Sequence, residues 1–133
     1  MEKRKVLIIE DEKSIRTMYA EILTDEGFEV LEEGDGMSGL NRALDGDWDV
    51  LLLDIMLPRL DGVELLKKLK NNPGTSSKPI IILSNLADPS IKKNCINLGA
   101  KEFLIKSDIV PSDVIIAIKK YVFTPGAKDS LSG

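Results

Sequence analysis

Five short apolar runs constrain the fold of this chain more than any other feature of its sequence. Successive runs end about 20 to 30 residues apart, which leaves room for one strand, one helix and two loops each time. The first, third and fourth runs are continuously apolar, which is typical of parallel strands covered by helices on both faces, whereas the second alternates like an exposed edge strand. The runs are Lys5–Glu10, Phe28–Glu32, Asp49–Asp54, Pro79–Ser84 and Glu102–Lys106.

The stretches between these runs have apolar residues at helical spacing. Alternating strands and helices predict an α/β fold, a parallel sheet between two layers of helices with right-handed crossovers. We expect one domain over residues 1–123, with a flexible tail or the start of a linker over 124–133. The predicted helices are Ser14–Glu26, Met37–Asp45, Val63–Asn71, Pro89–Leu98 and a last helix that opens at Pro111 or Ser112.

The composition excludes several classes of function. A net charge of −4 argues against a protein that binds nucleic acid or an anionic membrane by electrostatic attraction. The absence of histidine excludes Ser-His-Asp and Cys-His catalysis and histidine metal sites, and the single Cys95 excludes an intrachain disulfide. No apolar run approaches the roughly 20 residues of a membrane span, and the N-terminus lacks a signal-peptide core, so we expect a cytoplasmic protein.

Polar residues collect where the predicted strands end. Parallel strands share one carboxyl edge, and ligands of such sheets bind there. Glu10 and Asp11 follow the first run, Asp54 ends the third, Ser84 the fourth and Lys106 the fifth. Two carboxylates ~5 Å apart repel by roughly 3 kcal/mol at an effective dielectric of about 20, so three of them call for a cation.

Hard carboxylate oxygens favour Mg²⁺ as that cation. Mg²⁺ leaves coordination positions that phosphate oxygens can fill, and Lys106 with the Ser84 hydroxyl would suit the remaining oxygens of a phosphoryl group. Asp54 is then the nucleophile, and the product is an acyl phosphate.

The motifs resemble the receiver domain of two-component response regulators, a CheY-like protein. The resemblance runs from residue 5 to about 123 and implies a five-stranded sheet in the order 2-1-3-4-5. Its pieces are Val6–Glu12 (VLIIEDE), Leu52–Pro58 (LLDIMLP) with Asp61-Gly62, Ile82–Ser84 (ILS) and Gly99–Lys106 (GAKEFLIK).

The resemblance assigns a metal site. It implies that Asp54 is the phospho-acceptor and that Asp11 and Asp54 bind Mg²⁺ directly. Glu10 would act through water, and the Met56 backbone carbonyl would be a third ligand.

The resemblance also assigns a switch. Lys106 would pair with the phosphoryl group, Ser84 would move toward it, and Phe103 would swing inward with Ser84. The output would be a conformational shift of the face formed by the fourth helix, the fifth strand and the fifth helix. A self-complementary dimer through that face is a further expectation.

Five positions depart from the usual family pattern. Ser107 stands where a proline in a cis bond is usual, Asn85 replaces a small residue, and Glu10 replaces the commoner aspartate. Met56 and Leu86 are apolar at two variable positions where polar residues help to place an attacking water, which weakens the case for fast hydrolysis.

Two other motifs favour different chemistry less well. Residues 34–39 spell G-x-G-x-x-G, but a dinucleotide fold needs it after the first strand, and here it follows the second strand and two glutamates. Asp54-Ile-Met lacks the second aspartate of haloacid-dehalogenase-like phosphatases. Asp11 has an ordinary alternative, because an aspartate at that position can simply cap the first helix.

The predicted function is a phosphorylation-operated signalling switch rather than an enzyme that turns over a separate substrate. A sensor histidine kinase would donate the phosphoryl group and would dock beside the first helix, where Ile15 and Met18 are candidate contacts. Two alternatives remain open: a pseudo-receiver that only binds a protein partner, and the regulatory half of a longer DNA-binding response regulator.

Overall fold

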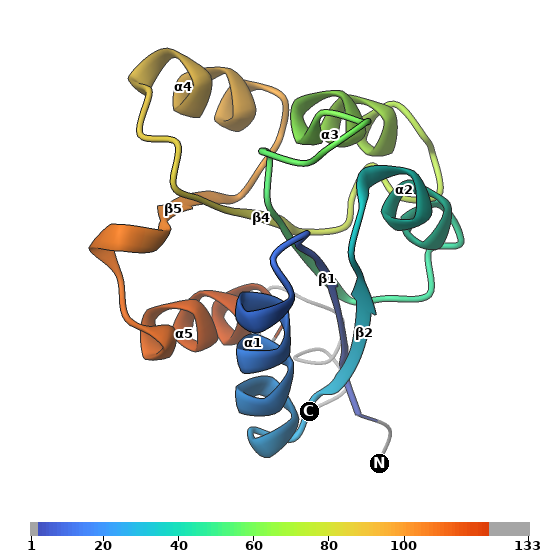
Figure 1. Cartoon of the computed structure of the whole chain (residues 1–133). Helices are drawn as coiled ribbons and strands as arrows, with labels where there is room; N and C mark the ends of the chain where they lie inside the picture. The colour runs from blue at the N-terminus through green and yellow to red at the C-terminus, as the bar shows by residue number, and fades with distance from the viewer. Residues whose placement is uncertain (1–2, 123–133) are drawn as a thin grey trace.

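The computed structural model describes residues 3–122, in which five strands alternate with five α-helices (Figure 1). The predicted tail over residues 124–133 lies outside the described residues. The elements are β1 Lys5–Ile9, α1 Lys13–Asp25, β2 Glu29–Glu33, α2 Gly36–Leu44, β3 Val50–Leu53, α3 Gly62–Lys70, β4 Ile80–Ser84, α4 Pro89–Asn97, β5 Glu102–Ile105, a 3₁₀ helix Lys106–Asp108 and α5 Pro111–Val122.

The five strands form one parallel sheet in the order β2-β1-β3-β4-β5, which confirms the predicted topology. β1 therefore lies between β2 and β3, and its Val6 and Ile9 pair with Val50 and Leu53 of β3. β2 is an edge strand, and its exposed and half-buried residues explain why its sequence alternates.

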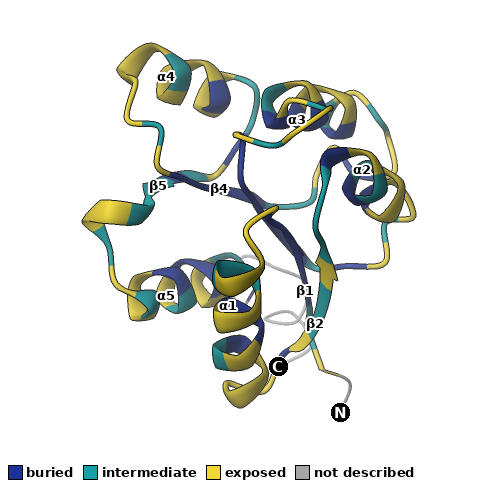
Figure 2. Cartoon of the chain, viewed as in Figure 1, coloured by how far each residue is buried: buried dark blue, intermediate teal, exposed yellow. Residues whose placement is uncertain are grey.

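Helices cover both faces of the sheet, α1 and α5 on one side and α2, α3 and α4 on the other (Figure 1). Side chains alternate along each strand, so β1 contributes to two cores. Val6 and Ile8 pack toward α1 and α5, whereas Leu7 and Ile9 pack toward the other three helices. β1, β3 and β4 are the most deeply buried part of the chain, and exposure is concentrated on the outer faces of the helices, in the loops and along the edge strand β2 (Figure 2).

The predicted carboxylates and Lys106 lie just past the strands, whereas Ser84 is the last residue of β4 and Phe103 lies within β5. Glu10 follows β1 by one residue, Asp54 follows β3 by one, and Lys106 opens the 3₁₀ helix after β5. The sheet fixes the position of each residue, while the loops that begin there leave its side chain free to reach its neighbours. None of the helices within residues 3–122 has the length and apolar character needed to cross a membrane.

Candidate functional site

Three carboxylates meet at the carboxyl edge of the sheet. Glu10, Asp11 and Asp54 each present an oxygen, and these oxygens lie within 4.8 Å of one another. Glu10 and Asp54 are only 4% and 6% exposed, whereas Asp11 is exposed to solvent. The sequence prediction that brings these three residues together is therefore consistent with the geometry, and an all-oxygen set open on one side fits Mg²⁺.

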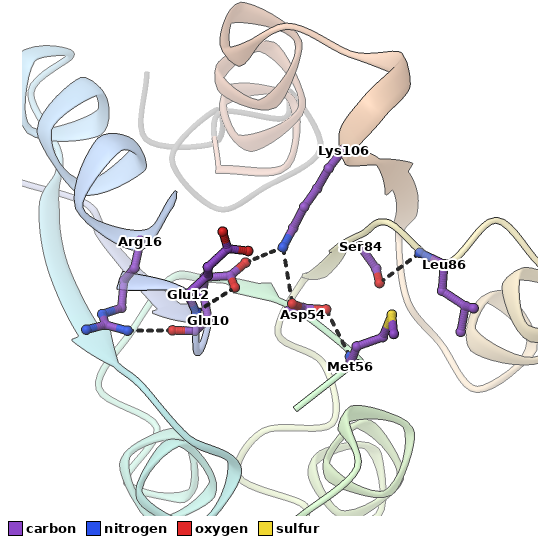
Figure 3. Close-up of polar contacts among 8 residues, drawn as sticks. All are labelled: Glu10, Glu12, Arg16, Asp54, Met56, Ser84, Leu86 and Lys106. Carbon is purple, nitrogen blue, oxygen red and sulfur yellow. Dashed lines mark hydrogen bonds and ion pairs between the residues drawn. The ribbon is translucent and has the colours of Figure 1, made fainter. Parts of the chain in front are cut away.

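Lys106 extends from the end of β5, at the same edge of the sheet, toward the two buried carboxylates (Figure 3). Its Nζ lies 2.6 Å from Oε1 of Glu10 and 3.2 Å from Oδ2 of Asp54. A buried carboxylate without a partner is costly, and among the described residues the Lys106 ammonium is the cation that pairs with both of them.

The protonation of the cluster follows from this geometry. Burial raises the pKa of Glu10, and the hydrogen bonds from Lys106 and from the Glu12 backbone oppose that rise. Burial by itself lowers the pKa of Lys106, but the hydrogen bond to Glu10 and the charges of Asp54 and Glu10 outweigh it, and the pKa is raised. Lys106 is therefore held as an ammonium.

Backbone N–H groups orient the two buried carboxylates. The Glu12 N–H donates to Oε2 of Glu10 at 3.0 Å, and the Met56 N–H donates to Oδ1 of Asp54 at 2.9 Å (Figure 3). Each carboxylate thus has one oxygen fixed by its own loop and the other by Lys106.

Asp11 is not used as a helix cap. The N-cap residue of α1 is Glu12, which makes no side-chain capping hydrogen bond. Within residues 3–122 we find no hydrogen bond or ion pair from the Asp11 carboxylate, so this carboxylate is available to a ligand.

Ser84 and Phe103 flank the cluster on the side of β4 and β5. The Ser84 hydroxyl is buried and accepts a hydrogen bond from the Leu86 N–H at 3.3 Å (Figure 3). Phe103 is already buried, with only 6% of its surface exposed, and packs in the core beneath α3 and α4. Their roles in a switch remain predictions.

An open groove of about 540 Å³ adjoins the cluster. Met56 and Leu86 both line it, and Met56 is 55% exposed. These apolar side chains, two residues beyond Asp54 and Ser84, therefore border the space above the carboxylates. The complete lining is Asp11, Ile55, Met56, Leu57, Pro58, Asp61, Val63, Leu86 and Ile91.

Gly62 has a role that the sequence motif alone did not explain. A Cβ at this position would lie 2.3 Å from the Cα of Ile55 and 2.7 Å from the backbone oxygen of Asp54. The Gly62 N–H donates to the Ile55 carbonyl at 3.1 Å. The first turn of α3 is thus pressed against the loop that carries Asp54, and only glycine permits that approach. The dipeptide Asp61-Gly62, which belongs to the motif quoted from the sequence, was the sequence signal for this close approach.

The glycine motif of residues 34–39 has a structural explanation. Asp35 caps α2, its side chain accepting a hydrogen bond from the Ser38 N–H at 2.9 Å, so a carboxylate already occupies the position that a phosphate would need. A Cβ at Gly36 would lie 2.6 Å from the backbone oxygen of Leu60, and one at Gly39 would lie 2.7 Å from Ile9. These two glycines allow α2 to pack closely.

Arg16 is a further residue whose contact near the site could not be expected from the sequence pattern. Its Nη1 donates to the backbone oxygen of Glu10 at 2.7 Å (Figure 3). An arginine seven residues beyond the end of β1 is not in itself a recognisable signal. The loop at Ser107, where the usual proline is missing, forms part of the 3₁₀ helix, and the described residues contain no cis peptide bond.

The comparisons with known proteins agree on one family. The family model of the response regulator receiver domain matches residues 6–119. The chain is 35% identical over 102 residues to the response regulator ArlR of Staphylococcus saprophyticus, covering 77% of this chain and 45% of the relative. It therefore spans less than half the length of that relative.

Solved structures give the same result. The chemotaxis response regulator CheY4 of Vibrio cholerae superposes with a TM-score of 0.82 at 28% identity, over 90% of this chain and 99% of that one. The CheX-CheY-BeF3-Mg²⁺ complex from Borrelia burgdorferi gives a TM-score of 0.80 at 25% identity, over 88% and 87%. The family model, the curated relative and the sheet order thus agree, and the chain belongs to the response regulator receiver domain family.

Proposed function

We propose that this receiver domain accepts a phosphoryl group on Asp54 in a Mg²⁺-dependent reaction. The observation that carries the proposal is the position of Lys106 between two buried carboxylates, next to the exposed carboxylate of Asp11. A cluster with more negative than positive charge serves no structural purpose, but it is suited to a cation and a phosphoryl group.

The residues that would hold Mg²⁺ are Asp11 and Asp54 directly, Glu10 through water, and Met56 through its backbone carbonyl. The close set of carboxylate oxygens supports this assignment, as does the related CheY that was solved with Mg²⁺ and BeF3. When bound, Mg²⁺ supplies positive charge that offsets the carboxylates and the incoming phosphoryl oxygens.

In the proposed reaction an oxygen of Asp54 forms a bond to phosphorus, while the bond between phosphorus and the imidazole nitrogen of the donor breaks. The electron pair of that bond stays on the nitrogen, so the phosphoryl group is transferred without oxidation or reduction. Lys106, which contacts Asp54 at 3.2 Å, would exchange this contact for a phosphoryl oxygen and stabilise its charge.

Phosphoryl uptake from acetyl phosphate is the direct test. The wild-type protein should gain the mass of one phosphoryl group with Mg²⁺ and none when the metal is chelated. A gain of equal size and rate under both conditions would contradict the proposal, and no gain at all would favour the pseudo-receiver that only binds a partner.

We propose a histidine kinase in the cytoplasm as the natural donor, docking beside α1. Met18 is 38% exposed on that helix, whereas Ile15 is half-buried against the core, so Met18 is the better contact to test. Met18→Lys should slow transfer from the kinase and leave labelling by acetyl phosphate unchanged. Met37→Lys is the matched control, because Met37 is 51% exposed on α2.

The proposed output is a shift of the face formed by α4, β5 and α5. The phosphoryl group would draw the Ser84 hydroxyl away from the Leu86 N–H, which it now contacts at 3.3 Å. Because Phe103 is already buried, its response would be to repack rather than to become buried. Sedimentation with and without beryllofluoride and Mg²⁺ tests whether this face then forms a dimer, and an unchanged sedimentation coefficient would exclude it.

A further inference from the structure

One side chain ties three elements together beside the carboxylate cluster. Arg16 belongs to α1, and its Nη1 donates to the backbone oxygen of Glu10, the residue that follows β1, at 2.7 Å (Figure 3). Its Nε lies 3.5 Å from Oε1 of Glu32 on β2. The guanidinium is mostly buried, since the Arg16 side chain is only 17% exposed.

The contact from Arg16 is made to the loop between β1 and α1, and this loop carries Asp11. The Asp11 carboxylate has no hydrogen bond that we can find within residues 3–122, so the loop backbone alone determines where it points. Two side-chain contacts hold that backbone. One is the Glu12 N–H bond to the Glu10 carboxylate at 3.0 Å, and the other is the bond from Arg16 to the Glu10 carbonyl.

These two contacts differ in how they respond to a ligand. The first uses the carboxylate of Glu10, which is itself part of the acidic cluster and would have to adjust its contacts to a cation or a phosphoryl group bound there. The second uses a backbone oxygen and a charged donor, which is the stronger kind of hydrogen bond and is independent of the cluster.

The neighbouring backbone leaves space for the guanidinium. A Cβ at Gly34 would lie 3.1 Å from Nη1 of Arg16. The first glycine of the 34–39 motif thus provides room for Arg16. Glu32 faces the same guanidinium and balances its charge, so the arginine can hold the loop without placing an unopposed positive charge beside a cation site.

We infer that Arg16 is a positioning residue for the metal site. It fixes the Glu10–Asp11 backbone so that the Asp11 carboxylate faces Asp54. This inference rests on the proposed function, in which Asp11 and Asp54 bind Mg²⁺. Arg16 itself contacts neither the metal nor the phosphoryl group.

The test compares two arginines that each pair with a glutamate of β2. Arg16→Met removes the contact to the Glu10 carbonyl, and Arg42→Met removes an ion pair with Glu33 at 3.0 Å that does not touch the cluster. The Mg²⁺ dissociation constant is measured by titration calorimetry, and the stability of each variant by urea unfolding without Mg²⁺. Arg16→Met should weaken Mg²⁺ binding by about tenfold, as is usual when the support of a metal ligand is lost. Arg42→Met should leave it unchanged.

Two further variants keep the inference testable if Arg16→Met does not fold. Arg16→Lys retains the charge and one donor, so it should restore part of the affinity. Gly34→Ala crowds the guanidinium and should weaken Mg²⁺ binding in the same direction. Unchanged Mg²⁺ affinity in both variants would overturn the inference.

The remaining outcomes separate this inference from the proposed function. If Arg16→Met and Arg42→Met change the Mg²⁺ affinity equally, Arg16 serves only the fold and the inference is wrong. If the wild-type protein binds no Mg²⁺ and takes no phosphoryl group from acetyl phosphate, the proposed function itself fails, and this inference fails with it.

Discussion

Charged side chains are paired differently at the amino and the carboxyl edge of the sheet. At the amino edge, Lys5 pairs with Asp47 at 2.8 Å, and its backbone N–H donates to Asp49 at 2.7 Å. Lys78 donates to the Trp48 backbone oxygen at 2.9 Å and lies 5.5 Å from the centre of the Trp48 ring. Each cation at this edge has a partner that suits it.

At the carboxyl edge the charges do not balance. Glu10, Asp11 and Asp54 lie together, and among the described residues Lys106 is the one cation that pairs with the two buried carboxylates, Glu10 and Asp54. The same five parallel strands form both edges of the sheet. The unbalanced charge at the carboxyl edge is therefore not a consequence of the topology. The comparison indicates that the amino edge serves stability and that the carboxyl edge keeps an unfavourable arrangement for the sake of a ligand.

The largest expected effect is a loss of phosphoryl uptake after a substitution at the carboxyl edge, which a substitution at the amino edge should not cause. Asp54→Asn should abolish phosphoryl uptake from acetyl phosphate, because the nucleophile and one metal ligand are lost. It should not destabilise the domain, since it removes one of three carboxylates that repel each other. Intact-protein mass spectrometry measures the first effect and urea unfolding the second.

Asp49→Ala is the control from the other edge. It removes the acceptor of the Lys5 N–H and should cost about 1–3 kcal/mol of stability, while labelling stays at the wild-type level. A phosphoryl adduct on Asp54→Asn that maps to no neighbouring carboxylate, or a loss of labelling in folded Asp49→Ala, would contradict the comparison.

The second prediction concerns the cation at each edge. Lys106→Met leaves two buried carboxylates without a partner and should destabilise the metal-free domain by about 3 kcal/mol. Mg²⁺ should restore part of that loss, because it binds the folded cluster and not the unfolded chain. The measurement is thermal unfolding over a range of Mg²⁺ concentrations.

Lys78→Met provides the contrast at the amino edge. It removes a hydrogen bond and a cation–π contact and should cost about 1 kcal/mol, a loss that Mg²⁺ does not repair. Equal Mg²⁺ stabilisation of both variants would mean that the metal binds elsewhere.

Two glycines sharpen the comparison through the backbone. Gly62→Ala places a Cβ 2.3 Å from the Cα of Ile55, so the loop that carries Asp54 must move, and the cost should be about 1–3 kcal/mol together with slower labelling. Gly46 lies at the amino edge with a φ of 73° and only distant neighbours, so Gly46→Ala should cost about 1 kcal/mol and leave labelling unchanged. Urea unfolding and the rate of acetyl phosphate labelling distinguish these results.

The sequence was sufficient to predict the fold and the composition of the site. Continuous apolar runs such as the one ending at Asp54 predict buried parallel strands, and parallel strands place their ends at one edge, so Lys106 meets Glu10 across 96 residues of sequence. The strand order, however, came from the family resemblance, because periodicity does not specify which strands are neighbours.

Other features could not be predicted because they depend on contacts between distant loops. Arg16 reaches a backbone oxygen, and no pattern of residue types marks a backbone acceptor. Gly62 is required by the close approach of α3, which exists only after the chain has folded. The burial of Phe103 agrees with the sequence, which favours a core aromatic at that position, but its packing partners beneath α3 and α4 become visible only in the fold.

The smallest expected effect is a pH dependence of opposite sign at the two edges. The hydrogen bond from Lys5 holds the pKa of Asp47 below its usual value of 3.8, whereas burial raises the pKa of Glu10 above its usual value of 4.5. Asp47 therefore contributes stability above its usual pKa, and this contribution is lost as the pH falls through its lowered pKa. Glu10 reduces stability as the pH rises from 4.5 through its raised pKa, because the folded protein then binds more protons than the unfolded chain.

Asp47→Asn tests the amino-edge half of this contrast. Asp47 is exposed, so the variant should be only slightly less stable than the wild type at neutral pH. Urea unfolding in steps from neutral pH to the most acidic pH at which the domain stays folded should show this small difference shrinking. A difference that stays constant with pH would mean that Asp47 contributes through packing and not through its charge. The amino edge would then no longer be the charge-balanced end of the sheet.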